Sequence, residues 1–407
     1  MTEILFASLI ISLLVTGLAV GLLLARRRLV PEGLIDVTVN EVQHLSAARG
    51  QKLLTVLHNN GVRVPAACGG TGTCGLCRVR VTGEGAGEPQ ATERGILTAA
   101  ERRGNIRLAC QTALQGDCAV EVPDDILSSG SGFTCKVAST RMLAPLIREI
   151  VLELPEGQAS TFRAGDFMQL TAPAYSLDFN QLDLPSDIRE AWDIAGWTDL
   201  HITSDVSVTR AYSLATRPED EGTAVFNIRL AVPPLGREQE VPPGVVSSWL
   251  FSLKEGDQVA ASGPFGDFHI QPTEREMVFV GGGVGMAPLR AMIHQELANG
   301  TTRKMRYCYG ARSAADLFYV EEFEALAKTH SNFSWTPVLS DPAPGDRWIG
   351  ATGFVHDALR TQLASHPAPE DCEYYLCGPP MMISAVLATL ERLGVERSSI
   401  FNDDFGV

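Results

Sequence analysis

Four cysteines form the pattern with the clearest chemical meaning in this chain of 407 residues. They follow the order C-x5-C-x2-C with a distant fourth member, and they are Cys68, Cys74, Cys77 and Cys110. Glycines are interleaved with the first three, so a short loop can turn these sulfur atoms inward. Four thiolates can hold two iron ions, and backbone N–H groups directed at the sulfurs raise the reduction potential. The pattern predicts a [2Fe-2S] cluster.

Zinc is the competing interpretation, because four thiolates also suit a structural zinc site. Zinc ribbons usually pair two C-x2-C knuckles, however, and the second knuckle is missing here. Plant-type ferredoxins have the spacing C-x4-C-x2-C, which is one residue shorter in the first gap. No metal-ligand spacing occurs among the eight histidines or at Cys118, Cys135, Cys308 and Cys372. The sequence therefore predicts no second metal site.

A glycine-rich turn at 281–288 lies between a predicted strand over 277–280 and a predicted helix over 289–298. Glycines allow close approach of the backbone to a ligand, and a helix N-terminus favours a pyrophosphate. The spacing departs from the G-x-G-x-x-G form of ordinary dehydrogenases, and Pro288 suits the first turn of a helix. The residues expected to bind the dinucleotide are Gly281, Gly282, Gly283, Gly285 and Pro288.

Three further motifs occur in the order that the ferredoxin-NADP reductase superfamily uses, and they are Arg210-Ala211-Tyr212-Ser213, the segment GVVSSWL at 244–250, and the segment GPFG at 263–266. Near the end of the chain, the segment CGPPM at 377–381 is similar to another motif of that superfamily. The glycine turn is similar to the G-x-G-x-A-P form of the same superfamily. The chain therefore resembles this superfamily, in which an antiparallel barrel binds FAD and a doubly wound domain binds the nicotinamide nucleotide.

The resemblance implies a role for each flavin residue. Arg210 pairs with the flavin pyrophosphate, Tyr212 lies along the isoalloxazine ring, and Ser213 hydrogen-bonds near N5. Ser247, at a helix N-terminus, holds phosphate. The alternative for Tyr212 is a tyrosine that only fills the core of the barrel.

The resemblance also implies chemistry near the C-terminus. Cys377 approaches the nicotinamide carbon that gives up hydride, and Gly378 and Pro379 lie beside the nucleotide. Phe405 covers the flavin until nicotinamide displaces it. The alternatives are a buried structural cysteine and a tail that packs on the surface. Preference for NADH rests on the resemblance alone, because Arg312 could reach the 2′-phosphate of NADPH.

Three domains are expected to position these motifs, which agrees with the length of the chain. We predict a [2Fe-2S] domain of α+β ferredoxin-like (β-grasp) type over 33–128, an antiparallel β-barrel that binds FAD over 133–271, and an α/β doubly wound NADH-binding domain over 274–407. The Gly/Ser-rich segment 128–132 forms the first boundary. Other expected elements are strands 34–39, 78–81, 226–232, 258–261 and 305–310 and helices 52–59 and 321–328.

An Asp-rich segment over 172–208 interrupts the barrel region and carries two tryptophans without clean periodicity. We interpret this segment as an insertion. It is either a solvated surface excursion or a docking or lid element.

Residues 1–28 are predicted to form a transmembrane anchor. The run Ile4–Ala25 is almost wholly apolar and uncharged, and as a helix it reaches the roughly 30 Å of a bilayer core. Arginines follow at 26–28, so the positive-inside rule predicts a single-pass protein with its N-terminus outside and its catalytic domains in the cytoplasm. A signal peptide, which has its positive charge before a shorter apolar core, is the alternative.

The formal net charge of −15 opposes a nucleic-acid partner, because such binding depends on Lys and Arg neutralising phosphates. The odd total of nine cysteines fits poorly with a secreted disulfide framework. The cysteine count therefore favours a catalytic part that lies in the cytoplasm.

The domain order resembles the reductase components of bacterial oxygenases. With an N-terminal membrane helix, the tail NDDFGV and the acidic insertion, the chain more closely resembles the F subunits of sodium-translocating NADH:quinone oxidoreductases. That family implies hydride transfer from NADH to FAD, then single electrons to a [2Fe-2S] cluster and onward to polytopic membrane subunits of the same respiratory complex, which reduces ubiquinone. It also implies the bacterial inner membrane, with residues 4–25 in lipid.

Sodium transport is expected in the partner subunits, because the predicted helix contains no ionisable residue that could line an ion path. Two alternatives remain open. One is a membrane-anchored NADH-dependent reductase that supplies an oxygenase or desaturase, and the other is a non-catalytic assembly or sensor protein that retains the reductase fold.

Overall fold

The computed structural model describes residues 13, 15–18, 21, 33–66, 69–123, 126, 132–157, 162–234, 236–237, 240–345 and 347–403. Most of the predicted anchor and of segment 128–132 lies outside these residues, as do Cys68 and Phe405. Within the described ranges, no helix is long and apolar enough to cross a membrane. The chain divides into two compact units, of which the first contains residues up to Asn60 together with Cys77–Pro123.

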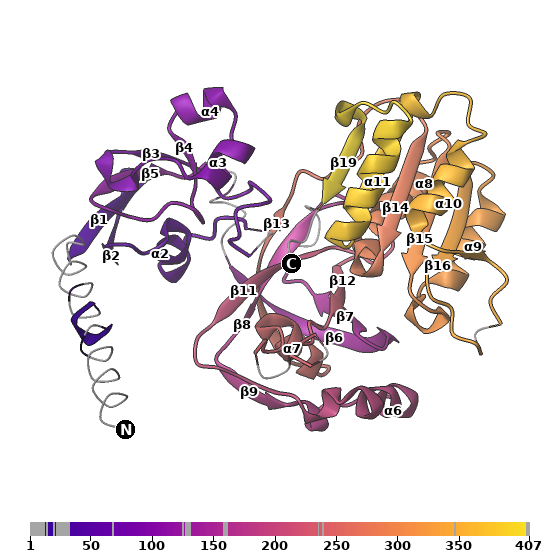
Figure 1. Cartoon of the computed structure of the whole chain (residues 1–407), viewed down its shortest axis with the longest axis horizontal. Helices are drawn as coiled ribbons and strands as arrows, with labels where there is room; N and C mark the ends of the chain where they lie inside the picture. Colours follow the sequence, from indigo (N-terminus) through magenta and orange to yellow (C-terminus); the bar gives the residue numbers. More distant parts are fainter. Residues whose placement is uncertain are drawn as a thin grey trace, which may run out of the picture. The chain divides into compact units, whose positions relative to one another are not determined.

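The first unit is built on a five-stranded mixed sheet with the order β2-β1-β5-β3-β4 (Figure 1). Strand β1 pairs antiparallel with β2 and parallel with β5, which confirms the predicted α+β class. Alternate residues of β1 are buried, as the two-residue period of a strand requires. The elements are β1 (Leu34–Val39), β2 (Gln43–Ala48), α2 (Leu53–Asn59), β3 (Arg78–Thr82), α3 (Ala91–Ile96), α4 (Ala99–Arg103), β4 (Ile106–Leu108) and β5 (Cys118–Glu121).

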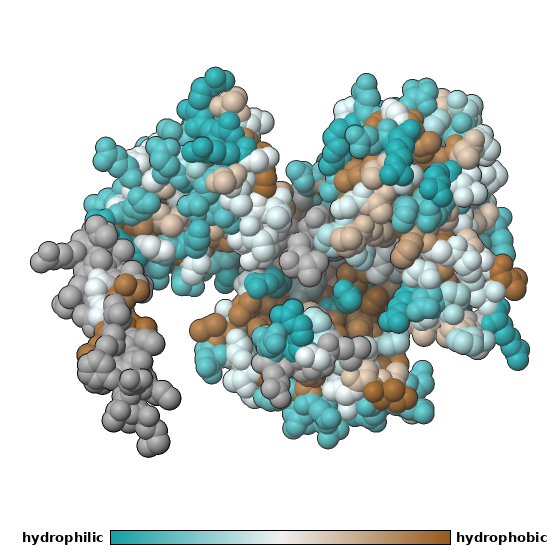
Figure 2. Space-filling view, viewed as in Figure 1, coloured by the Kyte–Doolittle hydropathy of each residue, from teal (hydrophilic) through white to brown (hydrophobic). Residues whose placement is uncertain are grey.

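The core of this unit includes hydrophobic side chains of its first helix. Leu53, Val56 and Leu57 of α2 are buried. On the face drawn in Figure 2, hydrophilic residues gather over α3 and α4. These two short helices contribute only Glu93 to the buried residues.

The second unit contains a six-stranded antiparallel sheet with the order β11-β8-β13-β6-β7-β12. A bridge pairs Leu214, which directly follows edge strand β11, with Phe226 of the other edge strand β12, so the sheet closes into the predicted barrel. Helix α7 contributes Leu250 and Phe251 to the barrel core. The elements are β6 (Phe133–Ala144), β7 (Ile147–Glu153), β8 (Phe167–Ala172), β11 (Val208–Ser213), β12 (Thr223–Arg229), α7 (Val245–Ser252) and β13 (Gln258–Phe265).

Strand β12 corrects the predicted range 226–232, because it begins at Thr223 and ends at Arg229. Its ladder with β7 ends at the pair Arg229–Ile147, where β7 itself begins, so the apolar residues after Arg229 have no strand partner on that side. Cross-strand pairing therefore determines the end of this strand.

The inserted segment is anchored in the barrel core and is not simply a solvated excursion. It forms β9 (Tyr175–Asp178), α6 (Ser186–Ala195) and β10 (His201–Ser204), with β9 and β10 paired antiparallel. Trp192 of α6 is 0% exposed, and its indole Nε1 donates to the carbonyl of Pro145 at 2.7 Å. Its ring stacks on Phe251 of α7. A docking or lid role stays a prediction.

The second unit also contains a parallel sheet with the order β17-β16-β15-β14-β18-β19, which confirms the doubly wound class (Figure 1). Helices α8 and α9 share one core with Phe279 and Tyr307, whereas α10 and α11 share another core with Val278 and Val280. The elements are β14 (Met277–Gly282), α8 (Met286–Ala298), β15 (Met305–Ala311), α9 (Val320–Thr329), β16 (Phe333–Leu339), β17 (Ala351–Thr352), α10 (Val355–Leu363), β18 (Glu373–Cys377), α11 (Pro380–Arg392) and β19 (Ile400–Asp403).

Strand order reverses at β14, which lies between β15 and β18. In open α/β sheets, ligands bind outside the carboxyl ends of the strands at such a point. Helix α8 starts there at Met286, three residues earlier than predicted, with Pro288 in its first turn as expected. The antiparallel and parallel sheets fall within the ranges predicted for the FAD and NADH domains, yet both belong to one compact unit, so the exact boundaries stay predictions.

Candidate functional site

Strand β11 carries three of the residues that the flavin motif implies. It pairs antiparallel with β8, which places Arg210 opposite Leu170 and Tyr212 opposite Met168. Arg210 is exposed, Tyr212 is half-buried against the barrel core, and Ser213 is buried. The strand thus presents a cation, an aromatic ring and a hydroxyl along one short segment.

A cavity of about 310 Å³ lies beside this strand. Its lining includes Arg210, Tyr212, Ser213 and Ser247, so the structure brings together all four residues that the sequence assigns to the flavin. A guanidinium group and a helix N-terminus suit a pyrophosphate, and an aromatic ring suits a flat heterocycle. The residues present therefore fit FAD.

Ser247 lies in the first turn of α7, and its hydroxyl is already used by the protein. Its Oγ accepts from Ala231 N and donates to the carbonyl of Gly244, both at 3.2 Å. A Cβ at Gly244 would lie 2.6 Å from this Oγ and 2.8 Å from Ala231 Cβ, so only glycine fits there. The serine ties the start of α7 to the chain after β12, while the N-terminal N–H groups of α7 can serve an anion.

The glycine turn after β14 meets the loop after β18. A Cβ at Gly285 would lie 2.0 Å from the carbonyl oxygen of Cys377, and Gly283 has a φ of +55°. Gly281 is the register partner of Cys377 in the β14–β18 ladder, and Pro379 is the N-cap of α11. The two loops that were expected to bind nucleotide therefore meet at the switch point of the sheet.

Ser213 Oγ donates a hydrogen bond of 3.3 Å to Asp403 Oδ2. Asp403 is the last residue of β19 and is the register partner of Cys377 on β18. Cys377 is 0% exposed. The end of β11, which carries the flavin motif, is thus connected to the ends of β18 and β19, where hydride transfer is expected.

Two residues of this site were missed by sequence reasoning. Asp403 had a signal in the sequence. It lies two residues before Phe405, so it can lie near the flavin that Phe405 is expected to cover. Asn227 of β12, which lines the same cavity, had none, because an asparagine inside an apolar run carries no motif. The positions of Cys68 and Phe405 lie outside the described residues.

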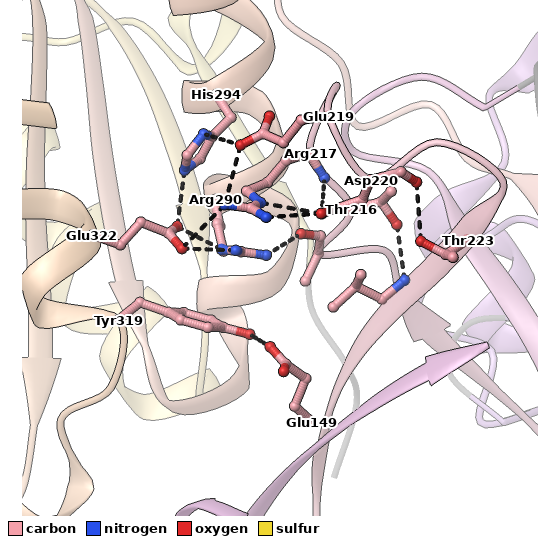
Figure 3. Close-up of polar contacts among 12 residues, drawn as sticks. Glu149, Thr216, Arg217, Glu219, Asp220, Thr223, Arg290, His294, Tyr319 and Glu322 are labelled. Carbon is pink, nitrogen blue, oxygen red and sulfur yellow. Dashed lines mark hydrogen bonds and ion pairs between the residues drawn. The ribbon is translucent and has the colours of Figure 1, made fainter. Parts of the chain in front are cut away.

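A buried polar network fixes α8 against the segment that follows Ser213 (Figure 3). Arg290 of α8 is 3% exposed and donates to the carbonyl of Ala215 at 2.7 Å. It also pairs with both carboxylate oxygens of Glu322 at 2.7 Å, and His294 lies 2.8 Å from the same carboxylate. Because α8 directly follows the glycine turn and Ala215 follows β11 closely, the network fixes the glycine turn relative to β11.

Glu322 is charged in this setting. Burial alone would raise its pKa, but hydrogen bonds from Arg290 and His294 outweigh that effect and lower the pKa to about 2. Arg217 extends the network by pairing with Asp220 at 2.8 Å and approaching Glu322 at 3.8 Å.

The cysteine pattern is partly visible. Cys77 and Cys110 are buried, and their sulfur atoms lie 3.2 Å apart, close enough to bind the same iron ion. Cys74 is half-buried. Four interleaved glycines have positive φ, as a tight inward-turning loop requires, and they are Gly69 (63°), Gly70 (94°), Gly72 (89°) and Gly75 (70°). Within the first unit, the pair Cys77–Cys110 fits two of the four sulfur ligands of an iron–sulfur cluster.

Cys118 provides a contrast within the same unit. Burial, followed by the charge of Asp117, raises the pKa of its thiol to about 11. A thiol this weakly acidic remains protonated at neutral pH, as expected of a buried structural cysteine.

A second group of potential ligands lies near the amino ends of β14 and β18. Glu276, His366 and Cys372 bring one ligand atom each within 4.8 Å of one another. His366 Nδ1 accepts from the backbone N–H of Ala368, so in the neutral ring the proton is on Nε2, which faces Glu276 at 3.2 Å. The other oxygen of Glu276 is held by Arg306. The geometry therefore favours a hydrogen-bonded structural group over a metal site.

Three protein families match parts of the chain. The 2Fe-2S iron-sulfur cluster binding domain matches residues 37–115, the oxidoreductase FAD-binding domain matches 183–270, and the oxidoreductase NAD-binding domain matches 279–387. Along the chain, these three matches follow the same order as the Cys77–Cys110 pair, the residues that line the cavity and the glycine turn.

Relatives match over the full length. The chain is 43% identical to the F subunit of the Na(+)-translocating NADH-quinone reductase of Marinomonas sp. over 406 residues, 99% of each chain. It is 44% identical to the protein of the same name from Methylococcus capsulatus over 408 residues, 100% of each chain.

Among solved structures, the Amycolatopsis reductase GcoB matches with a TM-score of 0.60 at 26% identity, covering 92% of this chain and 99% of that one. The ferredoxin reductase in carbazole 1,9a-dioxygenase matches with a TM-score of 0.58 at 23% identity over the same shares, a likeness of fold alone.

Proposed function

Because the chain belongs to the family of F subunits of Na(+)-translocating NADH-quinone reductases, we propose that it is the electron-input subunit of such a complex. It oxidises NADH, transfers the hydride to FAD, and passes single electrons through a [2Fe-2S] cluster to membrane subunits that reduce quinone. The three family matches support the assignment of NADH, the [2Fe-2S] cluster and FAD to this chain.

The contact between Ser213 and Asp403 is the observation that carries this proposal. It joins the end of the flavin strand to the strand end paired with Cys377, so hydride donor and acceptor sites belong to one compact unit. A nucleotide on the glycine turn and a flavin in the 310 Å³ cavity would meet there.

Bound FAD accepts two electrons as a hydride and releases them singly, which suits a one-electron [2Fe-2S] cluster. The side chains and backbone of the protein would bind the flavin and orient it. Arg210 and the N-terminus of α7 bind the pyrophosphate, and Tyr212 supports the ring. The Asp403 carboxylate accepts the Ser213 proton in a hydrogen bond, which fixes the hydroxyl of Ser213 at the reacting edge. Buried Cys377 keeps water from the nicotinamide side.

The membrane arrangement is part of the same proposal. Residues 4–25 anchor the chain in the bacterial inner membrane with the N-terminus outside, and polytopic subunits accept the electrons. The uncharged apolar run followed by three arginines supports this topology. A single cysteine placed before residue 4 should react with an impermeant thiol reagent in intact spheroplasts, and one placed at 30 should not; the reverse result would contradict the orientation.

The decisive experiment is an absorbance and EPR spectrum of the detergent-extracted full chain before and after NADH. We expect flavin bleaching and the signal of a reduced [2Fe-2S] cluster in one sample. A protein that bleaches no flavin would contradict the proposal. Copurification with polytopic subunits and sodium-stimulated quinone reduction are expected as well, whereas copurification with a hydroxylase alone would favour the oxygenase-reductase alternative.

A further inference from the structure

Gln111 directly follows the fourth cysteine of the predicted cluster, and its side chain contacts that cysteine. Gln111 Nε2 donates a hydrogen bond of 3.5 Å to Cys110 Sγ. This sulfur in turn lies 3.2 Å from Cys77 Sγ. Both cysteines are buried, Gln111 is half-buried, and all three residues belong to the first unit. An amide N–H is therefore directed at one of the two sulfur atoms that this unit provides for the cluster.

The backbone around Gln111 is fixed by hydrogen bonds. Its N–H donates to the carbonyl of Leu108 at 2.8 Å, and its carbonyl accepts from Lys52 Nζ, also at 2.8 Å. The carbonyl of the next residue, Thr112, accepts from the N–H of Leu53 at 2.9 Å, at the start of α2. Because these bonds hold the main chain, only the side-chain torsions of Gln111 remain to direct its amide.

Thr92 of α3 orients this amide. Its hydroxyl donates to Gln111 Oε1 at 3.1 Å. A cysteine that binds a metal is a thiolate, which has no proton and can only accept a hydrogen bond. With Oε1 bound to the hydroxyl, Nε2 faces the sulfur of Cys110, whereas the reverse orientation would place an amide oxygen against a negative sulfur. Both contacts thus require the same orientation of the amide.

A donor at this sulfur affects the two oxidation states of a cluster differently. Reduction adds one electron and increases the negative charge on the sulfur atoms. A hydrogen bond to sulfur therefore stabilises the reduced cluster more than the oxidised one, and such bonds are among the factors that set the reduction potential. In the proposed pathway the cluster takes its electron from the flavin, so a higher potential favours that transfer.

We propose that Gln111 raises the reduction potential of the [2Fe-2S] cluster through the hydrogen bond from its amide to Cys110, and that Thr92 is the positioning residue that orients the amide. The inference rests on the proposed binding of the cluster. It adds a side-chain donor to the backbone N–H groups expected from the glycine-rich cysteine loop.

The test is a redox titration of the detergent-extracted full chain, monitored through the EPR signal of the reduced cluster. At a fixed applied potential, the ratio of reduced to oxidised cluster in Gln111→Leu should be roughly tenfold lower than in wild type, which for one electron is a fall in midpoint potential of about 59 mV. Cluster content, measured as iron and as EPR intensity after dithionite, should stay the same. The matched control is Gln43→Leu, because the Gln43 amide donates to the carbonyl of Asn60, and this variant should keep the wild-type potential.

Thr92→Val separates the hydrogen bond from a mere change of polarity beside the cluster. In wild type it should lower the potential by less than Gln111→Leu does, because the amide is still present but is no longer oriented. Added to Gln111→Leu, it should have no further effect, since the group on which it acts is gone. An equal shift in both backgrounds would overturn the proposal, as would a wild-type potential in Gln111→Leu.

If Gln111→Leu assembles no cluster, Thr92→Val decides alone, because Thr92 is an exposed residue of α3. A wild-type potential in that variant overturns the inference. In each of these outcomes wild type still binds its cluster, so the proposed function stands. Wild type without the EPR signal of a [2Fe-2S] cluster after dithionite would overturn both the inference and the proposed function.

Discussion

Ser213 and Asp403 are 190 residues apart in the sequence, and a hydrogen bond of 3.3 Å joins them. One ends the barrel strand of the flavin motif and the other ends the last strand of the parallel sheet. Because Asp403 is also the register partner of Cys377, a single contact connects the strand of the flavin motif to the strand end that carries Cys377.

Asp403→Ala should slow flavin reduction by NADH. The carboxylate fixes the Ser213 hydroxyl, so its loss should cost roughly tenfold in rate while FAD content stays unchanged. Stopped-flow bleaching of the flavin measures this rate. Because both residues act through one bond, Ser213→Ala combined with Asp403→Ala should be no slower than the slower single variant. Fully additive losses would mean that the contact does not contribute as a unit.

Cys77→Ser should remove the [2Fe-2S] cluster and keep flavin reduction by NADH, because hydride transfer precedes the cluster. The same is expected of Cys74→Ala. EPR after dithionite reports the cluster, and absorbance after NADH reports the flavin. The matched control is Cys118→Ser, a buried cysteine of the same unit that should retain the cluster. Loss of flavin reduction in folded Cys77→Ser would contradict the proposed order of electron transfer.

Glu322→Gln should make the free energy of unfolding of the second unit less dependent on pH in the acid range. The folded-state pKa of Glu322 is about 2, below its ordinary value of 4.5. Its contribution is therefore complete above about pH 4.5 and disappears as the pH falls toward 2. Thermal unfolding of wild type and variant between these values tests this. Identical pH profiles would show that Arg290 and His294 do not stabilise the charged form.

Asp341→Asn should improve the use of NADPH. The exposed pair of Arg312 and Asp341, 3.4 Å apart, lies just beyond the carboxyl ends of β15 and β16. The carboxylate would repel a 2′-phosphate and occupies the guanidinium that could bind it. We expect kcat/KM for NADPH to rise several-fold, about 1 kcal/mol, with NADH little changed. An equal change for both nucleotides would place the pair away from the 2′ position.

Trp192→Ala should destabilise the barrel by about 3–5 kcal/mol, the usual cost of removing a buried tryptophan. Ile194→Ala, on the same helix but 82% exposed, should change the free energy of unfolding by less than about 0.5 kcal/mol. Chemical denaturation, monitored through the release of flavin, measures the free energy of unfolding of both variants. Similar values for the two variants would mean that α6 is not part of the barrel core.

Local chemistry was readable from the sequence. The cysteine spacing, the glycine turn and the apolar strand β14 each depend on residues within a few positions, and such patterns reflect backbone geometry directly. The predicted fold classes of both units were confirmed on this basis, with ends that differed by one to three residues at α8, α9 and β12.

The contacts that complete the site were not readable from the sequence. Asp403 reaches Ser213, Arg290 reaches Ala215, and Asn227 reaches Tyr319 because strand order and helix packing bring distant segments together. Trp192 likewise looked like part of a surface insertion until the fold placed it in the barrel core. The sequence by itself determined which cofactor chemistry this chain can support, because ligand types and loop glycines are local properties. Only the tertiary structure decided which side chains of the two sheets contact one another, since hydrogen bonds between sheets depend on how whole elements pack.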